Sequence, residues 1–375
     1  MKSLALILGL ALGIVSVTCA VVHAQEGGTV PVDSALQQLV SERVQVVENK
    51  TIFELFAFLN ASGYDDENSD SGMHAVRDRL RLELAHLLPP DLQARMRAYY
   101  AKHGKSADPY HYSVVAMCTS GPPDFTLGSV WGEVNEDSSF AALSDLPGLL
   151  REFAHAAPLD SLYQLVRTDY TDYIDAYRAT IVREVAKVMA YCGVPSTRDL
   201  SGHGEIARMV VIPNLLQSYE NAFSFDLGDT FFSIEGPQHT IGYNPHEFVH
   251  SITNQLSYDP HNTELLARAM PLFEAAKTVP AIKDEFASIL GFAEENLVRA
   301  ISLKYLESSD ASKNAKLADE MRREYRSGYT LERFYYEGLD EYQKSHRPLR
   351  DYYPTMLKKL DAARELAQWK KDSGR

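Results

Sequence analysis

The chain has 375 residues, of which 45% are hydrophobic and 23% charged, enough for a large core and for two subdomains. Its formal net charge of −14 at pH 7 argues against nucleic acid or an anionic membrane surface as a partner. Acidity of this kind favours solubility and says nothing about a substrate.

The amino terminus has the pattern of a secretory signal peptide, residues 1–24. Lys2 precedes an apolar run over residues 4–17, and residues 22–24 read Val-His-Ala, the small-x-small form of a cleavage site. The run is short for a membrane span and no second one follows. We therefore expect an exported protein, periplasmic or extracellular, that begins near Gln25 and keeps no stable membrane span after cleavage. Cys19 matches a lipoprotein processing site poorly, which leaves lipidation as a minor alternative.

Residues 25–200 are predicted to form a mostly helical N-terminal subdomain. One helical stretch is broken at Pro89-Pro90, and residues 140–193 are strongly helical with a break at Pro158. Residues 110–117 alternate and are rich enough in β-branched side chains to predict a strand. The composition changes after residue 200, where we expect the subdomain boundary.

Two cysteines, Cys118 and Cys192, remain after removal of the signal peptide. In an oxidising compartment they can pair as a disulfide. Two buried free thiols are equally consistent with the sequence, because cysteine is often a small core residue. Neither cysteine has a neighbour at metal-ligand spacing, so both alternatives are structural.

Residues 201–375 are predicted to form the second subdomain, in which three short strands precede a run of helices. The strands are expected at residues 206–212, 222–225 and 230–234. The stretch Phe231–Glu235, followed by Gly236-Pro237, indicates a strand near a sheet edge, where an extended peptide can pair. An ordinary core hairpin is the alternative. The predicted fold class is α+β, mainly helical, with a small sheet before the helix described next.

That helix carries the sequence His-Glu-x-x-His at residues 246–250. Residues four apart lie on one face of a helix, so His246 and His250 can offer their imidazoles to one metal ion. Glu247 points beside that face, where its carboxylate can take a proton from a water that the metal acidifies. Zinc in a catalytic site needs a third protein ligand and one open position. The motif therefore predicts a zinc hydrolase.

The surroundings of the motif support a helix that buries one side. Asn244 is a good N-cap, and Pro245 suits the first helical position. An apolar stripe continues through Phe248, Val249, Ile252 and Leu256.

Glu294 and Glu295 are the candidates for the third ligand, in a helix expected from about residue 283 to 306. The main apolar face of that helix is formed by Phe286, Leu290, Ala293, Leu297 and Ile301. Glu294 lies at the margin of this face, whereas Glu295 shares a polar stripe with Arg299. Arg299 can hydrogen-bond a ligating carboxylate four residues earlier. A surface salt bridge of little energetic value is the alternative for this pair.

The chain resembles a family of exported bacterial proteins of unassigned function that combines His-Glu-Phe-x-His-Ser with a later Glu-x-Leu-Val-Arg-Ala. The corresponding residues here are 246–251 and 295–300. Residues 48–55 and 328–354 contain further similar stretches, so the likeness touches both ends of the mature chain. The family looks like gluzincin metallopeptidases. That resemblance implies a gluzincin-like catalytic half, with Glu295 as third zinc ligand and Glu294 as the alternative.

A peptidase also needs a donor for the oxyanion of its tetrahedral intermediate. Gluzincins use a tyrosine or histidine beyond the third ligand. Tyr329, beside Gly328, is our first candidate here, and His239, before the motif helix, is a second. Other side chains available after the third ligand are Tyr325, Tyr335, Tyr336 and His346.

From these features we expect an exported Zn²⁺-dependent metallopeptidase that hydrolyses a peptide or protein substrate. The metal ligands are His246, His250 and Glu295, with Glu247 as general base. One alternative is a zinc hydrolase of a non-peptide amide, such as a cell-wall fragment or a small molecule. Another is an exported binding protein with a vestigial zinc site. The sequence predicts neither the substrate nor the oligomeric state.

Overall fold

The computed structural model describes residues 34–64, 74–104, 108–194, 208–219, 221–237, 245–280, 282–283 and 285–375. The predicted signal peptide, His239 and Asn244 lie outside these ranges. The described chain is mainly helical with one small mixed sheet, which confirms the predicted α+β class. Within the same ranges, no helix has the length and apolar character needed to cross a membrane.

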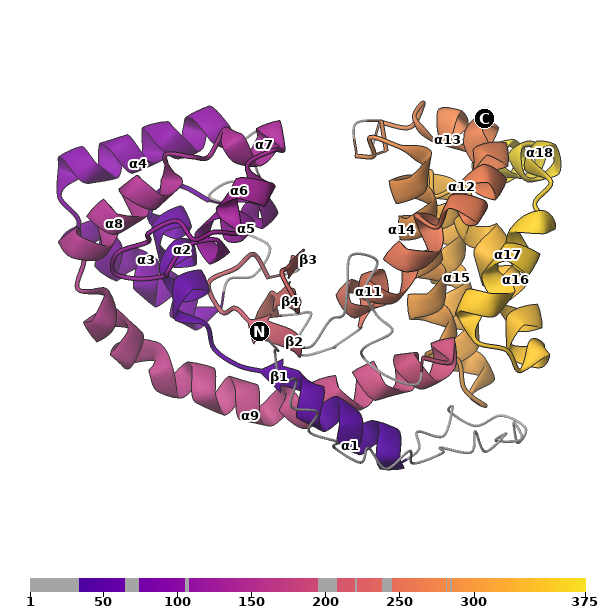
Figure 1. The fold of residues 1–375 in the computed structure, drawn as a ribbon, viewed down its shortest axis with the longest axis horizontal. Coiled ribbons are helices and arrows are strands. Elements are labelled where there is room, and N and C mark those ends of the chain that lie inside the picture. The colour runs from indigo at the N-terminus through magenta and orange to yellow at the C-terminus, as the bar shows by residue number, and fades with distance from the viewer. Residues whose placement is uncertain are drawn as a thin grey trace, which may run out of the picture.

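The first lobe is a group of helices around α2 (Figure 1). Asn49 caps α2 by accepting a hydrogen bond from the Ile52 N–H at 3.0 Å, and every residue from Ile52 to Ala61 is buried. The expected break at Pro89-Pro90 is present between α3 and α4. The helices of this lobe are α2 (Lys50–Ala61), α3 (Ala75–Leu87), α4 (Pro90–His103), α5 (Pro109–Met117), α6 (Trp131–Val134), α7 (Ser138–Ala141) and α8 (Leu146–Ala156).

The strand predicted at residues 110–117 is wrong, because this segment is helix α5. Its start is set by the Asp108 side chain, which accepts a hydrogen bond from the His111 N–H, and by Pro109 in the first turn. Residues 112–116 are all buried, with α2, α8 and β3 packed around the helix. A helix buried on every side has no polar face, so its apolar run looks the same as that of a buried strand.

Helix α9 (Leu159–Cys192) joins the two lobes along one side of the molecule (Figure 1). It starts directly after Pro158, where the break was predicted, and ends at Gly193, whose φ of 65° is left-handed. Helix α1 (Ser34–Arg43) packs on α9.

The sheet has four strands in the order β1-β2-β4-β3. Their bounds are β1 (Val44–Val46), β2 (Arg208–Pro213), β3 (Ala222–Leu227) and β4 (Thr230–Glu235). β1, β2 and β4 are parallel, whereas β3 is antiparallel to β4 and forms one edge. The three predicted strands are present. Of the two alternatives for Phe231–Glu235, the core hairpin is confirmed and the edge strand is wrong. β4 is an inner strand, because it pairs with β2 on one side and with β3 on the other.

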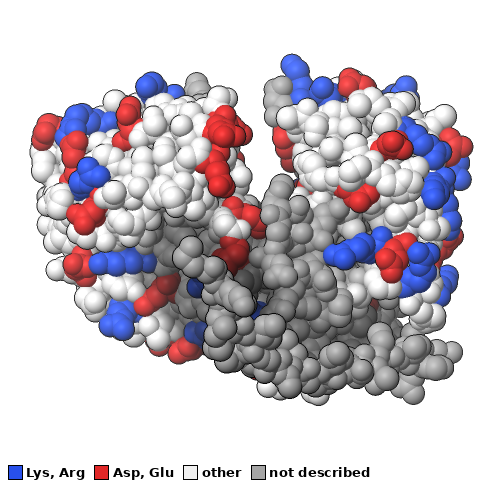
Figure 2. All heavy atoms as spheres, viewed as in Figure 1, with Lys and Arg blue, Asp and Glu red and all other residues white. Residues whose placement is uncertain are grey.

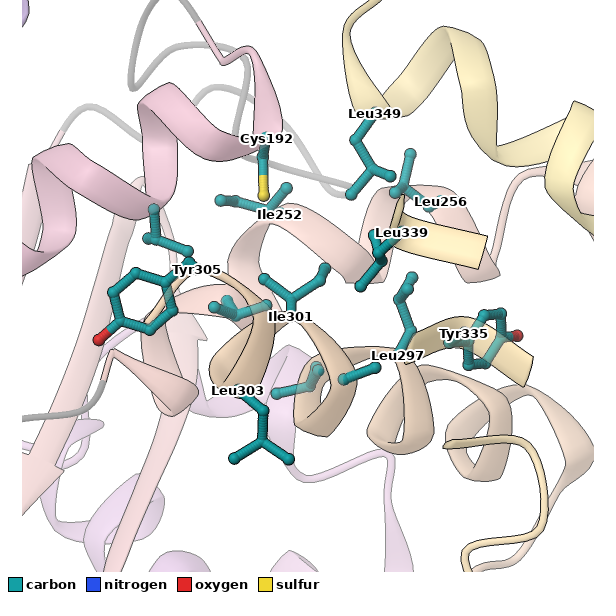
Figure 3. Close-up of a cluster of buried hydrophobic side chains, with 14 of the residues drawn as sticks. Cys192, Ile252, Leu256, Leu297, Ile301, Leu303, Tyr305, Tyr335, Leu339 and Leu349 are labelled. Carbon is teal, nitrogen blue, oxygen red and sulfur yellow. The ribbon is translucent and has the colours of Figure 1, made fainter. Parts of the chain in front are cut away.

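The second lobe contains the helices that follow the sheet. They are α11 (His246–Ser257), α12 (Pro260–Leu266), η3 (Ala267–Ala269), α13 (Met270–Ala276), α14 (Ile289–Lys304), α15 (Ala311–Ser327), α16 (Glu332–Ser345), α17 (Leu349–Lys358) and α18 (Ala362–Ser373). α11 packs on α14. Figure 3 shows this core, in which α9, α11, α14, α16 and α17 contribute side chains such as Cys192, Ile252, Leu297, Leu339 and Leu349.

Two buried clusters correspond roughly to the lobes, and the sheet contributes to both. Cys118 belongs to one cluster and Cys192 to the other, and both are buried free thiols. Burial raises the pKa of Cys118 to about 11. The free-thiol alternative therefore holds for this fold. The subdomain boundary near residue 200 stays a prediction.

On the face drawn in Figure 2, the two lobes are separated by an open notch. Helix α11 lies on the side of the second lobe that faces the sheet, and it contacts the edge strand β3 (Figure 1). The fold thus places the predicted motif helix beside a sheet edge.

Candidate metal centre

Helix α11 presents the two histidines of the motif on its less buried side. It begins at His246, one residue later than predicted, so Pro245 precedes the helix. The predicted stripe of Phe248, Val249, Ile252 and Leu256 is buried, as expected for the opposite side. The side chains of His246 and His250 are each 21% exposed. The packing therefore leaves both imidazoles accessible to a small ion.

Helix α14 brings a glutamate to these imidazoles. The helix begins at Ile289, with the Ser288 side chain accepting a hydrogen bond from the Gly291 N–H. This start is later than the predicted residue 283. Leu297 and Ile301 are fully buried in the core, and Glu295 points from α14 towards α11 with 13% of its side chain exposed.

His246, His250 and Glu295 form a group that could hold a metal ion. The Glu295 carboxylate lies 3.7 Å from His246 Nε2 through one oxygen and 3.3 Å from His250 Nε2 through the other. One donor atom from each residue lies within 4.8 Å of the other two. Ligand atoms about 2.0 Å from a tetrahedral zinc stand about 3.3 Å apart, so these residues fit such an ion.

Glu294, the alternative ligand, lies behind His250 instead. Its Oε1 is 2.7 Å from His250 Nδ1, which directs the other ring nitrogen towards Glu295. The Asn254 amide, with its nitrogen turned towards Glu294, donates to both carboxylate oxygens at 2.6 and 2.8 Å. Sequence reasoning missed this orienting contact. In the sequence, this contact was indicated only by the two adjacent acidic residues Glu294 and Glu295.

Arg299 lies beside Glu295 Oε1, the oxygen that also faces His246. Its Nε lies 2.7 Å from Glu295 Oε1, and its Nη1 donates to Glu324 at 2.9 Å. The Arg299 side chain is 23% exposed, so the contact with Glu295 is not the surface salt bridge considered above. The guanidinium carbon also lies 3.9 Å from the centroid of the Tyr329 ring.

The Tyr329 hydroxyl donates to Glu285 at 3.0 Å. Tyr329 contacts Arg299, which in turn contacts the candidate ligand Glu295. Its role as an oxyanion donor stays a prediction, as does that of His239, which lies outside the described residues.

The three candidate ligands differ in protonation behaviour, and His250 responds most directly to the neighbouring carboxylates. Burial alone would raise the pKa of Glu295, but His246, His250 and Arg299 hold it well below its usual value. Burial lowers the pKa of His246. Burial also opposes the charged form of His250, yet hydrogen bonds to Glu294 and Glu295 raise its pKa well above the usual value. Carboxylates that attract a proton to an imidazole also attract a divalent cation.

Glu247 lies between the metal ligands and the sheet edge. Ser224 of β3 donates a hydrogen bond to Glu247 Oε2 at 2.9 Å, a contact that sequence patterns did not indicate. Glu235, at the end of β4, is a second buried acid nearby. Burial and the charge of Glu247 raise the pKa of Glu235 to about 8. The hydrogen bond from Ser224 fixes the carboxylate of Glu247, which the motif assigns as general base.

Comparison with family models, with curated proteins and with solved structures finds no match to this chain. The resemblance to the exported family consequently rests on the quoted motifs alone, and function has to be argued from the site.

Proposed function

We propose that this protein is an exported, zinc-dependent metallopeptidase. The observation that carries the proposal is the convergence of His246, His250 and Glu295 from two packed helices, with Glu247 next to them. Two imidazoles and one carboxylate form a donor set that zinc uses in hydrolases. When bound there, zinc would supply a Lewis acid that polarises the scissile carbonyl and makes water more acidic.

The protein side chains have separate roles in this proposal. Glu247 accepts the proton of the attacking water on its carboxylate and delivers it to the leaving amine. Ser224 keeps that carboxylate in place through its hydrogen bond. Glu294 fixes the orientation of His250, and Arg299 fixes Glu295.

A peptide is the proposed substrate because β3 offers a backbone edge next to Glu247. The register of β3 against β4 pairs Ser224 with Ser233, and the Gly236 N–H donates to the Asn221 carbonyl. Because bonded pairs alternate along an antiparallel ladder, the backbone groups of Ala222, Ser224 and Asp226 point away from β4. An extended peptide could add to this edge as a further strand. β3 thus takes the substrate-binding role first expected of β4.

The test is to measure zinc content and peptide hydrolysis of the mature protein and of Glu247→Gln. We expect about one zinc per chain in both proteins and near-complete loss of hydrolysis in the variant, because the amide cannot accept the proton. Glu264→Gln, an exposed glutamate in the same lobe, is the control and should match wild type. Equal turnover by Glu247→Gln would refute the mechanism.

Two further results would favour the alternatives. Hydrolysis of cell-wall fragments without hydrolysis of peptides would identify a non-peptide amide as the substrate. A mature protein that holds no zinc would favour a binding protein with a vestigial site.

A further inference from the structure

A polar cavity lies in the first lobe, where the start of α2 meets the turn between α8 and α9. Its volume is about 170 Å³. Its polar side is lined by Lys50 and Glu54 of α2 and by Asp160 and Ser161 of α9. Its apolar side includes Pro122, Pro123, Ala154, Ala157 and Leu159. The metal ligands lie on α11 and α14 in the other lobe, so this cavity is a separate site (Figure 1).

Glu54 is buried in the wall of this cavity with an unsatisfied oxygen. The residue is 3% exposed, and its Oε2 has no hydrogen-bond partner among the described residues. Burial raises the pKa of Glu54 to about 7, against the opposing effect of Lys50. An ionised carboxylate that lacks a donor in a buried position is costly. A ligand that supplies a positive charge and a donor would remove that cost.

The charges around Glu54 leave the cavity negative. Lys50 Nζ lies 2.5 Å from Asp160 Oδ1 but 3.9 Å from Glu54 Oε1, so the ammonium is held mainly by Asp160. Lys50 and Asp160 are the charged groups that act on Glu54. The cavity residues from α8 and from the 122–123 turn are alanines and prolines, which do not ionise. With Glu54 ionised, these groups sum to one negative charge, which excludes an anionic ligand.

A metal ion is also a poor match for this cavity. In the part of the chain that the structure describes, the only group of three metal-binding side chains is the one at the metal centre. Two carboxylates and apolar walls instead suit a monovalent organic cation. A primary ammonium carries three N–H donors on a compact charge, and its alkyl chain can pack against proline and leucine.

We propose that this cavity binds an organic ammonium group, which donates to the Glu54 carboxylate while its alkyl chain lies along Pro122, Pro123 and Leu159. A small primary amine and a lysine side chain of a peptide share this chemistry. The proposal does not depend on the peptidase function.

The first experiment is calorimetric titration of the mature protein with n-butylamine at pH 6 and pH 8. The ionised fraction of a carboxyl with a pKa near 7 rises from about one tenth to about nine tenths over this range. We therefore expect binding about tenfold tighter at pH 8, with no binding of the uncharged isostere n-butanol. Absence of n-butylamine binding at both pH values would overturn the proposal.

Two variants test whether Glu54 is the residue that binds the ammonium group. Glu54→Gln keeps the shape but removes the charge, so binding and its pH dependence should both be lost. Asp169→Asn is the matched control on α9, because Asp169 pairs with Arg79 at the surface and lies outside the cavity. This control should bind as wild type does. Unchanged binding by Glu54→Gln would contradict the assignment.

A measurement on the wild-type protein covers the case in which Glu54→Gln does not fold. Carbon-13 NMR of the Glu54 carboxyl should show that n-butylamine lowers its pKa, and an unchanged pKa would contradict the proposal. Calorimetric titration with Nα-acetyl-lysine methylamide then distinguishes the two sources of the ammonium group, a small primary amine and a lysine side chain of a peptide. Affinity well above that of n-butylamine indicates a lysine of a peptide, and equal affinity indicates a small amine.

Discussion

The orientation of His250 depends on a residue that does not reach the metal position. Glu294 is 6% exposed and accepts a hydrogen bond from the Nδ1 side of His250, so it selects the tautomer whose Nε2 is free for a metal. Outer contacts of this kind are worth about 10–100-fold in metal affinity. We expect Glu294→Ala to weaken zinc binding by about that factor.

Zinc affinity measured by competition with a chelator tests this expectation. Glu264→Ala, an exposed acid on α12, should leave the affinity unchanged. If Glu294→Ala also binds zinc as tightly as wild type, Glu294 does not orient the ligand.

Glu332 gives a prediction about stability and pH. It is fully buried at the start of α16, and burial together with the nearby Glu324 raises its pKa to about 10. Between the unfolded pKa near 4.5 and this value, the folded state holds one more proton than the unfolded state. Stability from this group is thus complete at low pH and falls as pH rises, by up to about 1.4 kcal/mol per pH unit.

Glu332→Gln keeps a neutral side chain of the same shape and should remove this slope. Urea unfolding at pH 5, 7 and 9 should show the variant gaining stability relative to wild type as pH rises. Glu274→Gln changes an exposed carboxyl and should follow the wild-type slope. Parallel curves for Glu332→Gln and wild type would show that Glu332 is ionised in the fold.

At the scale of residues, the sequence could predict the motif and narrow the third ligand to two positions. Helical spacing alone puts His246 and His250 on one face. The choice between Glu294 and Glu295 depends on how α14 is rotated against α11, which is a tertiary property. The Ser224 contact depends on the same kind of information, because β3 meets α11 only in the folded chain.

Among the elements, the edge strand β3 makes the most specific functional prediction. The N–H of Ser224 points away from β4, while its hydroxyl donates to Glu247. Ser224→Ala removes only the hydroxyl, whereas Ser224→Pro also removes the N–H without breaking a bond to β4. If a peptide pairs with this edge, Ser224→Pro should have a higher KM than Ser224→Ala, by about fivefold for one hydrogen bond.

Steady-state kinetics on one peptide with both variants separates the two contributions. The kcat of the variants should be similar, since both lack the hydroxyl. Equal KM values would rule out backbone pairing at this position.

The errors at the scale of elements have a common physical cause. The apolar pattern of residues 110–117 reports burial, and burial on every side hides the helical period of α5. The strand Phe231–Glu235 was recognised correctly, but its place in the sheet depends on β2, a strand about 20 residues earlier in the chain. Local sequence patterns therefore identified most helices and strands but did not determine which elements pack or pair with each other.

For the whole molecule, α9 is the structural link between the two lobes (Figure 1). Its first part, up to Tyr170, packs in the cluster around α2, and its second part, from Ile174, packs in the cluster that contains α11 and α14. The sequence predicted this helix, but it did not reveal that the helix crosses from one cluster to the other.

Breaking α9 at this crossing should separate metal binding from catalysis. Ala176 is exposed, so a substitution there acts through the backbone alone. Ala176→Pro removes a helical hydrogen bond and costs about 3 kcal/mol, whereas Ala176→Gly costs about 1 kcal/mol. The three candidate ligands all lie on α11 and α14, so the proline variant should still bind zinc. Hydrolysis should fall much more, because the placement of the lobes and of β3 against α11 relies on an unbroken α9.

Zinc stoichiometry and peptide turnover measured on the same preparations test this separation. The glycine variant should keep most of its turnover, which shows that helix continuity rather than the alanine side chain matters. Loss of zinc in Ala176→Pro in proportion to its loss of turnover would mean that the metal centre itself needs the intact link. Full turnover by the proline variant would instead show that the lobes work independently of α9.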